Sequence, residues 1–252
     1  MRIRHFGHTD IGMKRAHNED AFLADAELGL FIVCDGVGGR ARGEIASQET
    51  VDFIWEWVKG EEAALATARS SGGPASIEIL SKILRGAIQN ACYMVHSLGE
   101  INPDQRGMST TTSVFLLAGN VGIIGQVGDS RIYLTRDGEV SQLTEDHTLI
   151  NYQLKYGLIT EEEAKNSKVK NVITRAVGHK EYVEVDIMPI PLFLNDRILL
   201  CSDGLHGYFS DKKQVGDFMA RDVQEAVLEA IHFANEQGGS DNITALLLEL
   251  IE

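Results

Sequence analysis

A short apolar run that ends abruptly in a carboxylate constrains this chain more than any other stretch. Residues 30–34 are continuously apolar and rich in β-branched and aromatic types, which predicts a buried strand. Asp35-Gly36 follows directly, which places an acidic side chain on a turn that a small residue makes easily. The pattern recurs at Asp203-Gly204, after a second apolar run. Two core strands of this chain are therefore expected to end in carboxylates.

A third carboxylate, Asp241, precedes another apolar run at residues 243–248. Two bare carboxylates about 4 Å apart repel each other by roughly 4 kcal/mol at an effective dielectric constant near 20, and a divalent cation would turn that cost into binding energy. The donors are all oxygens, without a set of Cys and His ligands, which favours Mg²⁺ or Mn²⁺ over zinc. The alternative is that Asp-Gly pairs simply mark turns, as we expect for Asp137-Gly138.

The order of predicted elements indicates antiparallel sheets with helices packed outside them. Helical spacing of apolar residues predicts helices over 43–58 and 77–98, and a third helix runs from an Asp222 cap to Gln237. Strands are predicted at residues 3–8, 21–23, 30–34, 110–117, 121–127, 131–135, 140–143, 182–190, 197–201 and 243–248. The mixed segment 149–178 interrupts the strands, so we interpret it as an insertion. This order is not the βαβ alternation of a parallel sheet.

Composition excludes several classes of protein. The 252 residues suit one domain spanning 1–252, and a net charge of −14 argues against nucleic acid as a partner. Apolar runs stay below the ~18 to 20 residues of a membrane span, and the first residues lack the apolar segment of a signal peptide. Three cysteines imply no disulfide framework. We therefore expect a cytoplasmic protein with no membrane partner.

One glycine-rich segment offers a competing function. Residues 36–41 formally match the dinucleotide-binding fingerprint G-x-G-x-x-A, because they follow a strand and precede a helix. However, Asp35 would press a carboxylate towards the pyrophosphate. The region about 20 residues further on is also helix-like rather than a strand with an acidic residue. The interpretation as a nucleotide-binding oxidoreductase is the weaker one.

An ordered set of motifs resembles the metal-dependent Ser/Thr protein phosphatases, the protein phosphatase 2C-like family of the bacterial stand-alone type. The resemblance covers nearly the whole chain. It rests on residues 15–20 (RAHNED), 35–39 (DGVGG), 108–111 (MSTT), 127–131 (VGDSR), 202–204 (SDG) and 240–242 (SDN). It implies an α+β fold, namely a four-layer αββα sandwich of two antiparallel sheets flanked by helix pairs. The insertion at 149–178 would be the flap beside the active site.

The resemblance also implies roles for individual residues. The direct ligands of a two-metal centre of Mn²⁺ or Mg²⁺ would be Asp35, the Gly36 carbonyl, Asp203 and Asp241. Glu19 and Asp20 would act through metal-bound waters, Arg15 would grip the substrate phosphate, and Asp129 would hold a third metal with Asp203. The residues expected to take part in catalysis are Arg15, Asp20, Asp35 and Asp203.

The implied activity is hydrolysis of phosphoserine and phosphothreonine in proteins by a metal-activated water. Partners would then be phosphorylated proteins made by a Ser/Thr kinase, and we expect a monomer. One alternative within the family is a catalytically silent relative that only binds phosphoproteins. The chain departs from many eukaryotic members at Val37, where those proteins carry a histidine that can protonate the leaving group. The sequence therefore leaves the leaving-group proton donor unassigned.

Overall fold

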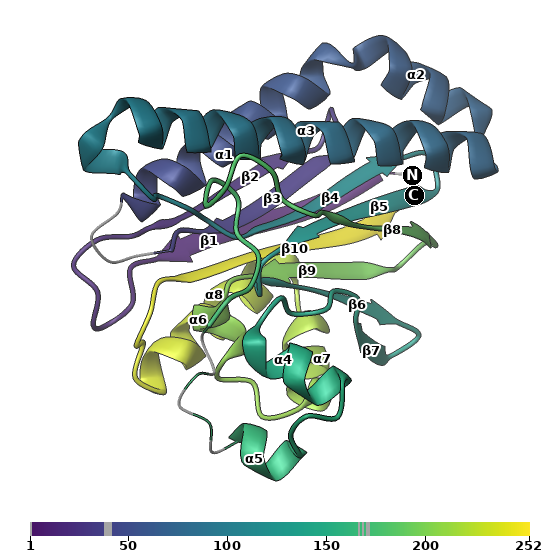
Figure 1. Cartoon of the computed structure of the whole chain (residues 1–252). Coiled ribbons are helices and arrows are strands. Elements are labelled where there is room, and N and C mark those ends of the chain that lie inside the picture. The colour runs from purple at the N-terminus through teal and green to yellow at the C-terminus, as the bar shows by residue number, and fades with distance from the viewer. Residues whose placement is uncertain (1, 38–41, 166, 168, 170–171) are drawn as a thin grey trace.

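Two antiparallel sheets stacked face to face form the centre of the computed structural model (Figure 1). The structure describes residues 2–37, 42–165, 167, 169 and 172–252. The first sheet has the strand order β1-β10-β9-β6-β7 and the second has β2-β3-β4-β5-β8. The strands of the first sheet are β1 (Arg2–Asp10), β10 (Ile243–Ile251), β9 (Arg197–Cys201), β6 (Arg131–Arg136) and β7 (Glu139–Gln142). Those of the second are β2 (Asp20–Asp25), β3 (Leu30–Asp35), β4 (Thr112–Ala118), β5 (Val121–Val127) and β8 (Asp186–Pro191).

Helices cover the outer face of each sheet (Figure 1). The second sheet is covered by α1 (Gly43–Gly60) and α3 (Gly73–Ile101), with α2 (Glu62–Ser71) packed on α3, and the 3-10 turn η1 (Pro103–Gln105) follows. The first sheet contacts α6 (Asp203–His206), α7 (Lys212–Met219) and α8 (Val223–Glu236). The insertion forms α4 (Leu149–Lys155) and α5 (Glu161–Lys165). In the part of the chain that the structure describes, no helix is long and apolar enough to cross a membrane.

The four layers explain why the central strands are continuously apolar. In β3, Phe31 and Val33 face the core between the two sheets, whereas Leu30, Ile32 and Cys34 face the helical layer of α1 and α3. Strand β10 is likewise buried on both faces. One face packs against the helices and the other against the second sheet. A strand that is buried on both faces needs apolar residues at every position, so the alternation of a half-exposed strand is lost.

The predicted α+β sandwich is confirmed, and so are the predicted helices and most strands. Three details differ. Helix α2 was not predicted, because only Leu65 and Ala68 of its ten residues are buried and the apolar pattern is weak. Helices α6 and α7 were also not predicted. Strand β8 begins at Asp186, four residues after the predicted start at residue 182.

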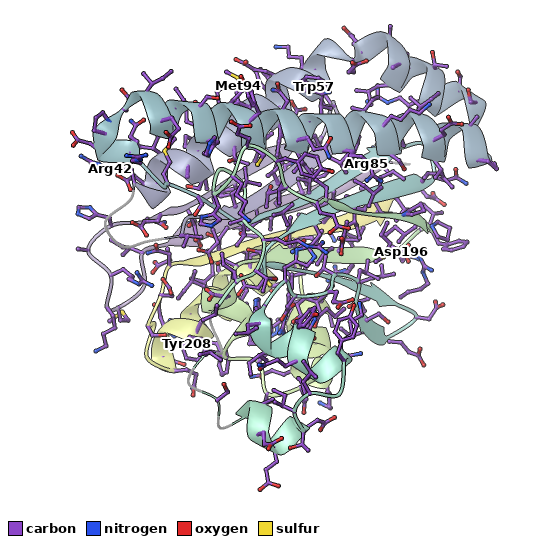
Figure 2. The ribbon with its side chains drawn as sticks, viewed as in Figure 1. Arg42, Trp57, Arg85, Met94, Asp196 and Tyr208 are labelled. Carbon is purple, nitrogen blue, oxygen red and sulfur yellow. The ribbon has the colours of Figure 1, made fainter. Side chains whose placement is uncertain are left out.

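Asp196 ties the turn between β8 and β9 to the first sheet (Figure 2). Its side chain is 1% exposed and accepts two hydrogen bonds from Arg136 of β6, at 2.8 and 2.7 Å, and one from the Phe193 amide at 2.9 Å. Its backbone carbonyl accepts a bond from the Leu250 amide in β10 at 3.0 Å. The buried carboxylate and the backbone of Asp196 together therefore join three segments at this end of the sandwich.

We predict that Asp196→Ala lowers the free energy of unfolding by about 2–4 kcal/mol, because it leaves the Phe193 amide without its acceptor and removes both carboxylate contacts of Arg136, which keeps only the Pro191 carbonyl. Urea denaturation monitored by circular dichroism measures this loss. The matched control is Glu78→Ala, which removes an exposed pair with Lys82 and should leave the midpoint nearly unchanged. Equal midpoints for the two variants would contradict the assigned role of Asp196.

Candidate metal centre

Strand ends of both sheets bring the predicted carboxylates to one edge of the sandwich. Asp20 begins β2 and lies opposite Asp35, the last residue of β3, in the antiparallel register. Asp203 opens α6 directly after β9, and Asp241 lies just before β10, the neighbour of β9. Burial raises the pKa of Asp35, and repulsion from the neighbouring carboxylates of Asp20 and Asp203 raises it further. The structure thus gathers the three aspartates singled out from the sequence, with Asp20 among them.

Asp20 is held in place through one oxygen and leaves the other free. Its Oδ2 accepts hydrogen bonds from Ser202 Oγ at 2.8 Å and from Thr244 Oγ1 at 2.6 Å. Its Oδ1 is buried without a hydrogen-bond partner among the described residues, and the same holds for Asp203 Oδ1. Burial raises the pKa of Asp20 to about 7. A buried carboxylate oxygen left without a donor is costly unless a cation reaches it.

Backbone contacts around Asp35 fix its direction. The Asp35 amide donates to Thr111 Oγ1 at 3.0 Å, and the Asp35 carbonyl accepts from the Thr111 amide at 2.9 Å and from Thr110 Oγ1 at 2.8 Å. Burial, together with Asp20 and Asp203, raises the pKa of Asp35 well above its ordinary value. Burial and the neighbouring Asp241 raise the pKa of Asp203 as well.

The glycine after each of these aspartates permits a close approach of backbones. A Cβ at Gly36 would lie 2.5 Å from the carbonyl oxygens of both Glu19 and Gly43, and one at Gly204 would lie 1.9 Å from the Asn242 carbonyl oxygen. Neither glycine has a left-handed backbone, so the small residue predicted at these positions is required by close packing and not by an unusual backbone conformation. Glycine is needed here because any larger residue would push apart the segments that carry the acidic side chains.

The loop of residues 11–19 carries Arg15 and is clamped by the side chain of Asn242. Asn242 Nδ2 donates to the carbonyls of Ile11 and His17 at 2.9 and 3.0 Å, and its Oδ1 accepts from the Glu19 amide at 2.8 Å. Asn242 is 4% exposed. The sequence motif contained this residue, but its positioning role was not foreseen, because its partners lie more than 200 positions away.

Arg15 lies against one of the predicted ligands. Its Nη2 donates to Asp241 Oδ2 at 2.6 Å, with both side chains partly exposed. Burial raises the pKa of Glu19, whose carboxylate also lies within the field of Asp241 and Arg15. The guanidinium therefore supplies positive charge to the acidic cluster in this state of the protein.

Asp129 lies beside the cluster on a separate turn. It follows β5 in the Gly128-Asp129 turn, and its carbonyl oxygen is 2.9 Å from Nε2 of His206 in α6. Burial and the nearby Asp203 raise the pKa of Asp129 to about 7. The predicted neighbourhood of Asp129 and Asp203 is therefore present in the structure.

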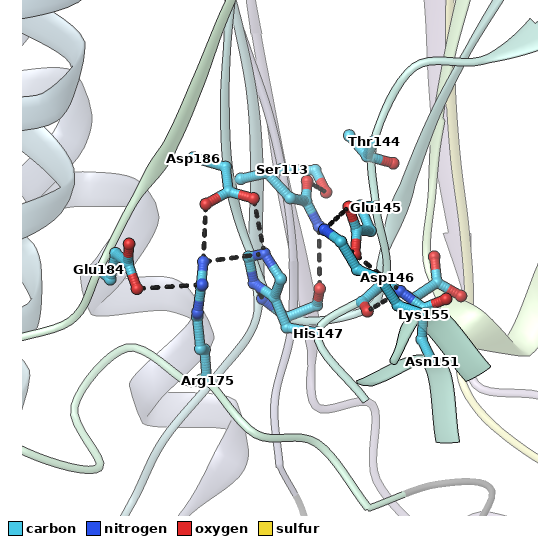
Figure 3. A network of polar contacts seen from close by, with 12 residues as sticks. Ser113, Thr144, Glu145, Asp146, His147, Asn151, Lys155, Arg175, Glu184 and Asp186 are labelled. Atoms are coloured by element: carbon cyan, nitrogen blue, oxygen red, sulfur yellow. Dashed lines mark hydrogen bonds and ion pairs between the residues drawn. The ribbon is translucent and has the colours of Figure 1, made fainter. Parts of the chain in front are cut away.

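His147 joins this turn to the insertion through a polar network that sequence reasoning did not find (Figure 3). Its Nδ1 accepts from the Gly128 amide at 3.1 Å, and its Nε2 lies 3.0 Å from Asp186 Oδ2. Arg175 donates to Asp186 Oδ1 at 2.6 Å and pairs with Glu184 at 3.0 Å. Nothing in the local sequence distinguishes this histidine from an ordinary buried one, because its partners come from three distant segments.

The donor set fits a hard divalent cation. All its members are oxygens, two of them buried and without partners in the described part of the chain. As the side chains stand, no three Asp, Glu, His or Cys residues among those described converge closely enough to hold an ion. One of the candidate ligands, Asp241, is engaged by Arg15 at 2.6 Å.

The dinucleotide interpretation of residues 36–41 is not supported. Strand β3 is antiparallel to both of its neighbours, β2 and β4, whereas that fingerprint belongs to a parallel βαβ unit. Residues 38–41 of the fingerprint lie outside the part of the chain that the structure describes. Val37 is described, and its amide donates to the Ser109 carbonyl at 2.9 Å.

Comparison with known proteins gives one consistent family. Residues 13–247 match the family model of protein phosphatase 2C. The chain is 37% identical over 245 residues to the serine/threonine phosphatase stp of Listeria welshimeri, covering 96% of this chain and 93% of that protein. It is 36% identical over 250 residues to the protein phosphatase PhpP of Streptococcus pneumoniae, covering 97% and 96%.

A solved structure shows the same similarity. The catalytic domain of the serine/threonine protein phosphatase PstP, in complex with two manganese ions, superimposes with a TM-score of 0.82 and 31% identity. The match covers 100% of this chain and 99% of that one.

We predict that the cation-free protein becomes more stable as the pH falls from about 8 to about 6.5. The folded state holds protons on Asp20 and Asp129 with pKa values of about 7, whereas the unfolded chain releases them near 3.8, so raising the pH through 7 costs stability. Neutral buried histidines add little above pH of about 6.5, because that is their ordinary pKa.

Differential scanning fluorimetry in chelator measures this dependence. Asp20→Asn should raise the melting temperature at about pH 8 and flatten the profile, because it removes one buried charge. The control Asp137→Asn lies on an exposed hairpin turn and should keep the wild-type profile. A wild-type melting temperature that decreases as the pH is lowered from about 8 to about 6.5 would refute the prediction.

Proposed function

The chain belongs to the protein phosphatase 2C family, and we propose that it hydrolyses phosphoserine and phosphothreonine in proteins with the help of divalent cations. The observation that carries this proposal is the buried aspartate cluster with its unpartnered oxygens, at the end of a sandwich that matches the family over residues 13–247. Among similar proteins, both a relative at 37% identity and a manganese-bound structure are Ser/Thr phosphatases.

We assign the cation ligands as follows. Asp35, the Gly36 carbonyl, Asp203 and Asp241 hold two ions of Mn²⁺ or Mg²⁺ directly, Glu19 and Asp20 act through waters, and Asp129 with Asp203 holds a third. When bound, two such ions supply a nucleophilic water at neutral pH and neutralise charge on the phosphate. Asp20 Oδ1 and Asp203 Oδ1, which have no hydrogen-bond partner among the described residues, support this assignment. Burial and the neighbouring aspartates also raise the pKa of Asp35.

The residues of the chain position and prepare the substrate. Arg15 presents a planar fork that can bind two phosphate oxygens, and Asp241 engages it until a cation takes over that carboxylate. Asn242 holds the loop of Arg15 and Glu19 at a fixed distance from the aspartates. Val37 has no titratable group, so this position contributes no proton to the leaving serine or threonine oxygen.

A cleft of about 850 Å³ runs from the aspartates along the insertion and is large enough for a segment of a phosphoprotein. It is lined at one end by Asp203 and Asp241, and further out by Ile150 and Leu154 of α4 and by Tyr208 and Phe209. We therefore interpret residues 149–178 as a flap that belongs to a single domain spanning 1–252. The partners are phosphoproteins made by a Ser/Thr kinase, encountered by a monomer in the cytoplasm.

We predict that the protein hydrolyses an aryl phosphate and a phosphothreonine peptide with Mn²⁺ and loses both activities in excess chelator. Asp203→Asn should lower turnover at least about 100-fold, since it removes a carboxylate assigned to more than one cation. A catalytically silent relative would bind the phosphopeptide without turnover, and binding measured by calorimetry distinguishes that outcome. Undiminished turnover in chelator would contradict the cation-dependent reaction.

Arg15→Ala should raise KM for the phosphopeptide about 10-fold or more and lower kcat less, because a bidentate donor to the phosphate is lost. Arg15→Lys should restore part of the loss, since an ammonium carries the charge without the planar fork. Steady-state kinetics measures both. The control Arg106→Ala removes another exposed arginine, paired with Glu100 away from the cluster, and should change neither constant. Unaltered constants in Arg15→Ala would refute the role.

A further inference from the structure

The geometry points to His147 as a positioning residue: we propose that its neutral ring, protonated on Nε2, fixes the Gly128-Asp129 turn and joins it to the base of the flap. The inference deepens the proposed function, on which it rests, because Asp129 is the residue assigned to the third cation. Figure 3 shows His147 together with Arg175, Glu184 and Asp186, the side chains on its Nε2 side.

The two ring nitrogens of His147 have different partners, and these partners determine the tautomer. Nδ1 lies 3.1 Å from the amide nitrogen of Gly128, and an amide can only donate, so Nδ1 must be the bare acceptor. The proton therefore sits on Nε2 and points to Asp186 Oδ2 at 3.0 Å. The Nη1 of Arg175, 3.2 Å from Nε2, is itself a donor, so its acceptor is Asp186 Oδ1 at 2.6 Å.

Asp186 is thus held from two sides, by the His147 ring at one oxygen and by Arg175 at the other. Arg175 in turn pairs with Glu184 at 3.0 Å, so a chain of opposite charges keeps the acceptor of His147 in place. His147 is 7% exposed, and burial lowers its pKa, which favours the neutral ring that both contacts require. The second partner of a histidine commonly sets which nitrogen is free to act.

The backbone of His147 makes the same connection between the turn and the flap. Its amide donates to the Gly128 carbonyl at 3.0 Å, and its carbonyl accepts from the Thr174 amide at 2.7 Å. The next residue, Thr148, caps the first helix of the flap, because its Oγ1 accepts from the Asn151 amide at 3.2 Å. The two ends of the flap also pair with each other, through the Leu149 amide and the Val172 carbonyl at 2.8 Å.

The turn itself faces the cluster of aspartates. The Asp129 carbonyl is 2.9 Å from His206 Nε2, and His206 belongs to the short helix that Asp203 opens. Any rotation of the Gly128-Asp129 turn would move the Asp129 carboxylate relative to Asp203. His147 therefore lies where a movement of the flap would also move Asp129, the residue assigned to the third cation.

Two substitutions separate the two ring contacts. In His147→Asn the side-chain oxygen can take the place of Nδ1 and keep the Gly128 contact, while the link to Asp186 is lost. In His147→Gln the longer side chain can reach Asp186 in place of Nε2, while the acceptor for Gly128 is lost. These two variants should differ in function although they remove one ring contact each.

We expect His147→Gln to lower turnover of a phosphothreonine peptide about 10- to 100-fold and to raise the Mn²⁺ concentration for half-maximal turnover. The affinity of the tight cation pair, measured by calorimetric titration, should stay unchanged. His147→Asn should keep turnover within about 3-fold of wild type and change mainly KM for the peptide, because its turn is intact but its flap tether is lost. Asp196→Ala controls for lost stability away from the turn, and its turnover should remain.

Two readouts do not depend on catalysis. The ¹⁵N chemical shifts of the His147 ring should show the proton on Nε2, and hydrogen exchange at the Gly128 amide should quicken in His147→Gln but not in His147→Asn. A proton on Nδ1, or a His147→Gln variant with wild-type Mn²⁺ dependence and amide protection, would overturn the proposal. Wild-type protein inert towards every phosphate ester would refute the proposed function instead, while these two readouts would still test the position of His147.

Discussion

A few clustered, largely desolvated carboxylates repel one another, and the rest of this structure has to offset that unfavourable free energy. Asp20 and Asp35 face each other across adjacent strands, and Asp203 joins them from the other sheet. Burial raises the pKa of each, which means that the fold works against its own charges until a cation arrives. A more flexible fold would lower this cost by letting these side chains turn towards water.

The sandwich opposes such a movement because its central strands are packed on both faces. Phe31 and Val33 pack between the sheets while Ile32 and Cys34 pack under the helices, so β3 cannot shift without opening two cores. The local links are also short. Gly36 and Gly204 allow backbones to approach within distances that a Cβ would forbid, and Asn242 holds the remaining loop by three hydrogen bonds.

Much of this arrangement could be predicted from local patterns, and the remainder could not for identifiable reasons. The apolar runs before Asp35 and Asp203 indicated strand ends correctly, because burial on both faces leaves a clear signal in composition. Helix α2 was missed because its buried side is confined to Leu65 and Ala68. The positioning roles of Asn242 and His147 were missed because they depend on partners from distant segments, which a single sequence does not reveal. The need for small residues at Gly36 and Gly204 was predicted, but its cause, a close approach of backbones, appears only in three dimensions.

We propose that the carboxylates at this edge of the sandwich are a cation site around which the fold is built. A crystal structure of the protein soaked in Mn²⁺, with anomalous scattering used to locate the ions, tests this. We expect two strong peaks about 2.0–2.2 Å from oxygens of Asp35, Asp203 and Asp241, with Arg15 released from Asp241. Peaks elsewhere on the molecule, with the Arg15–Asp241 pair intact, would contradict it.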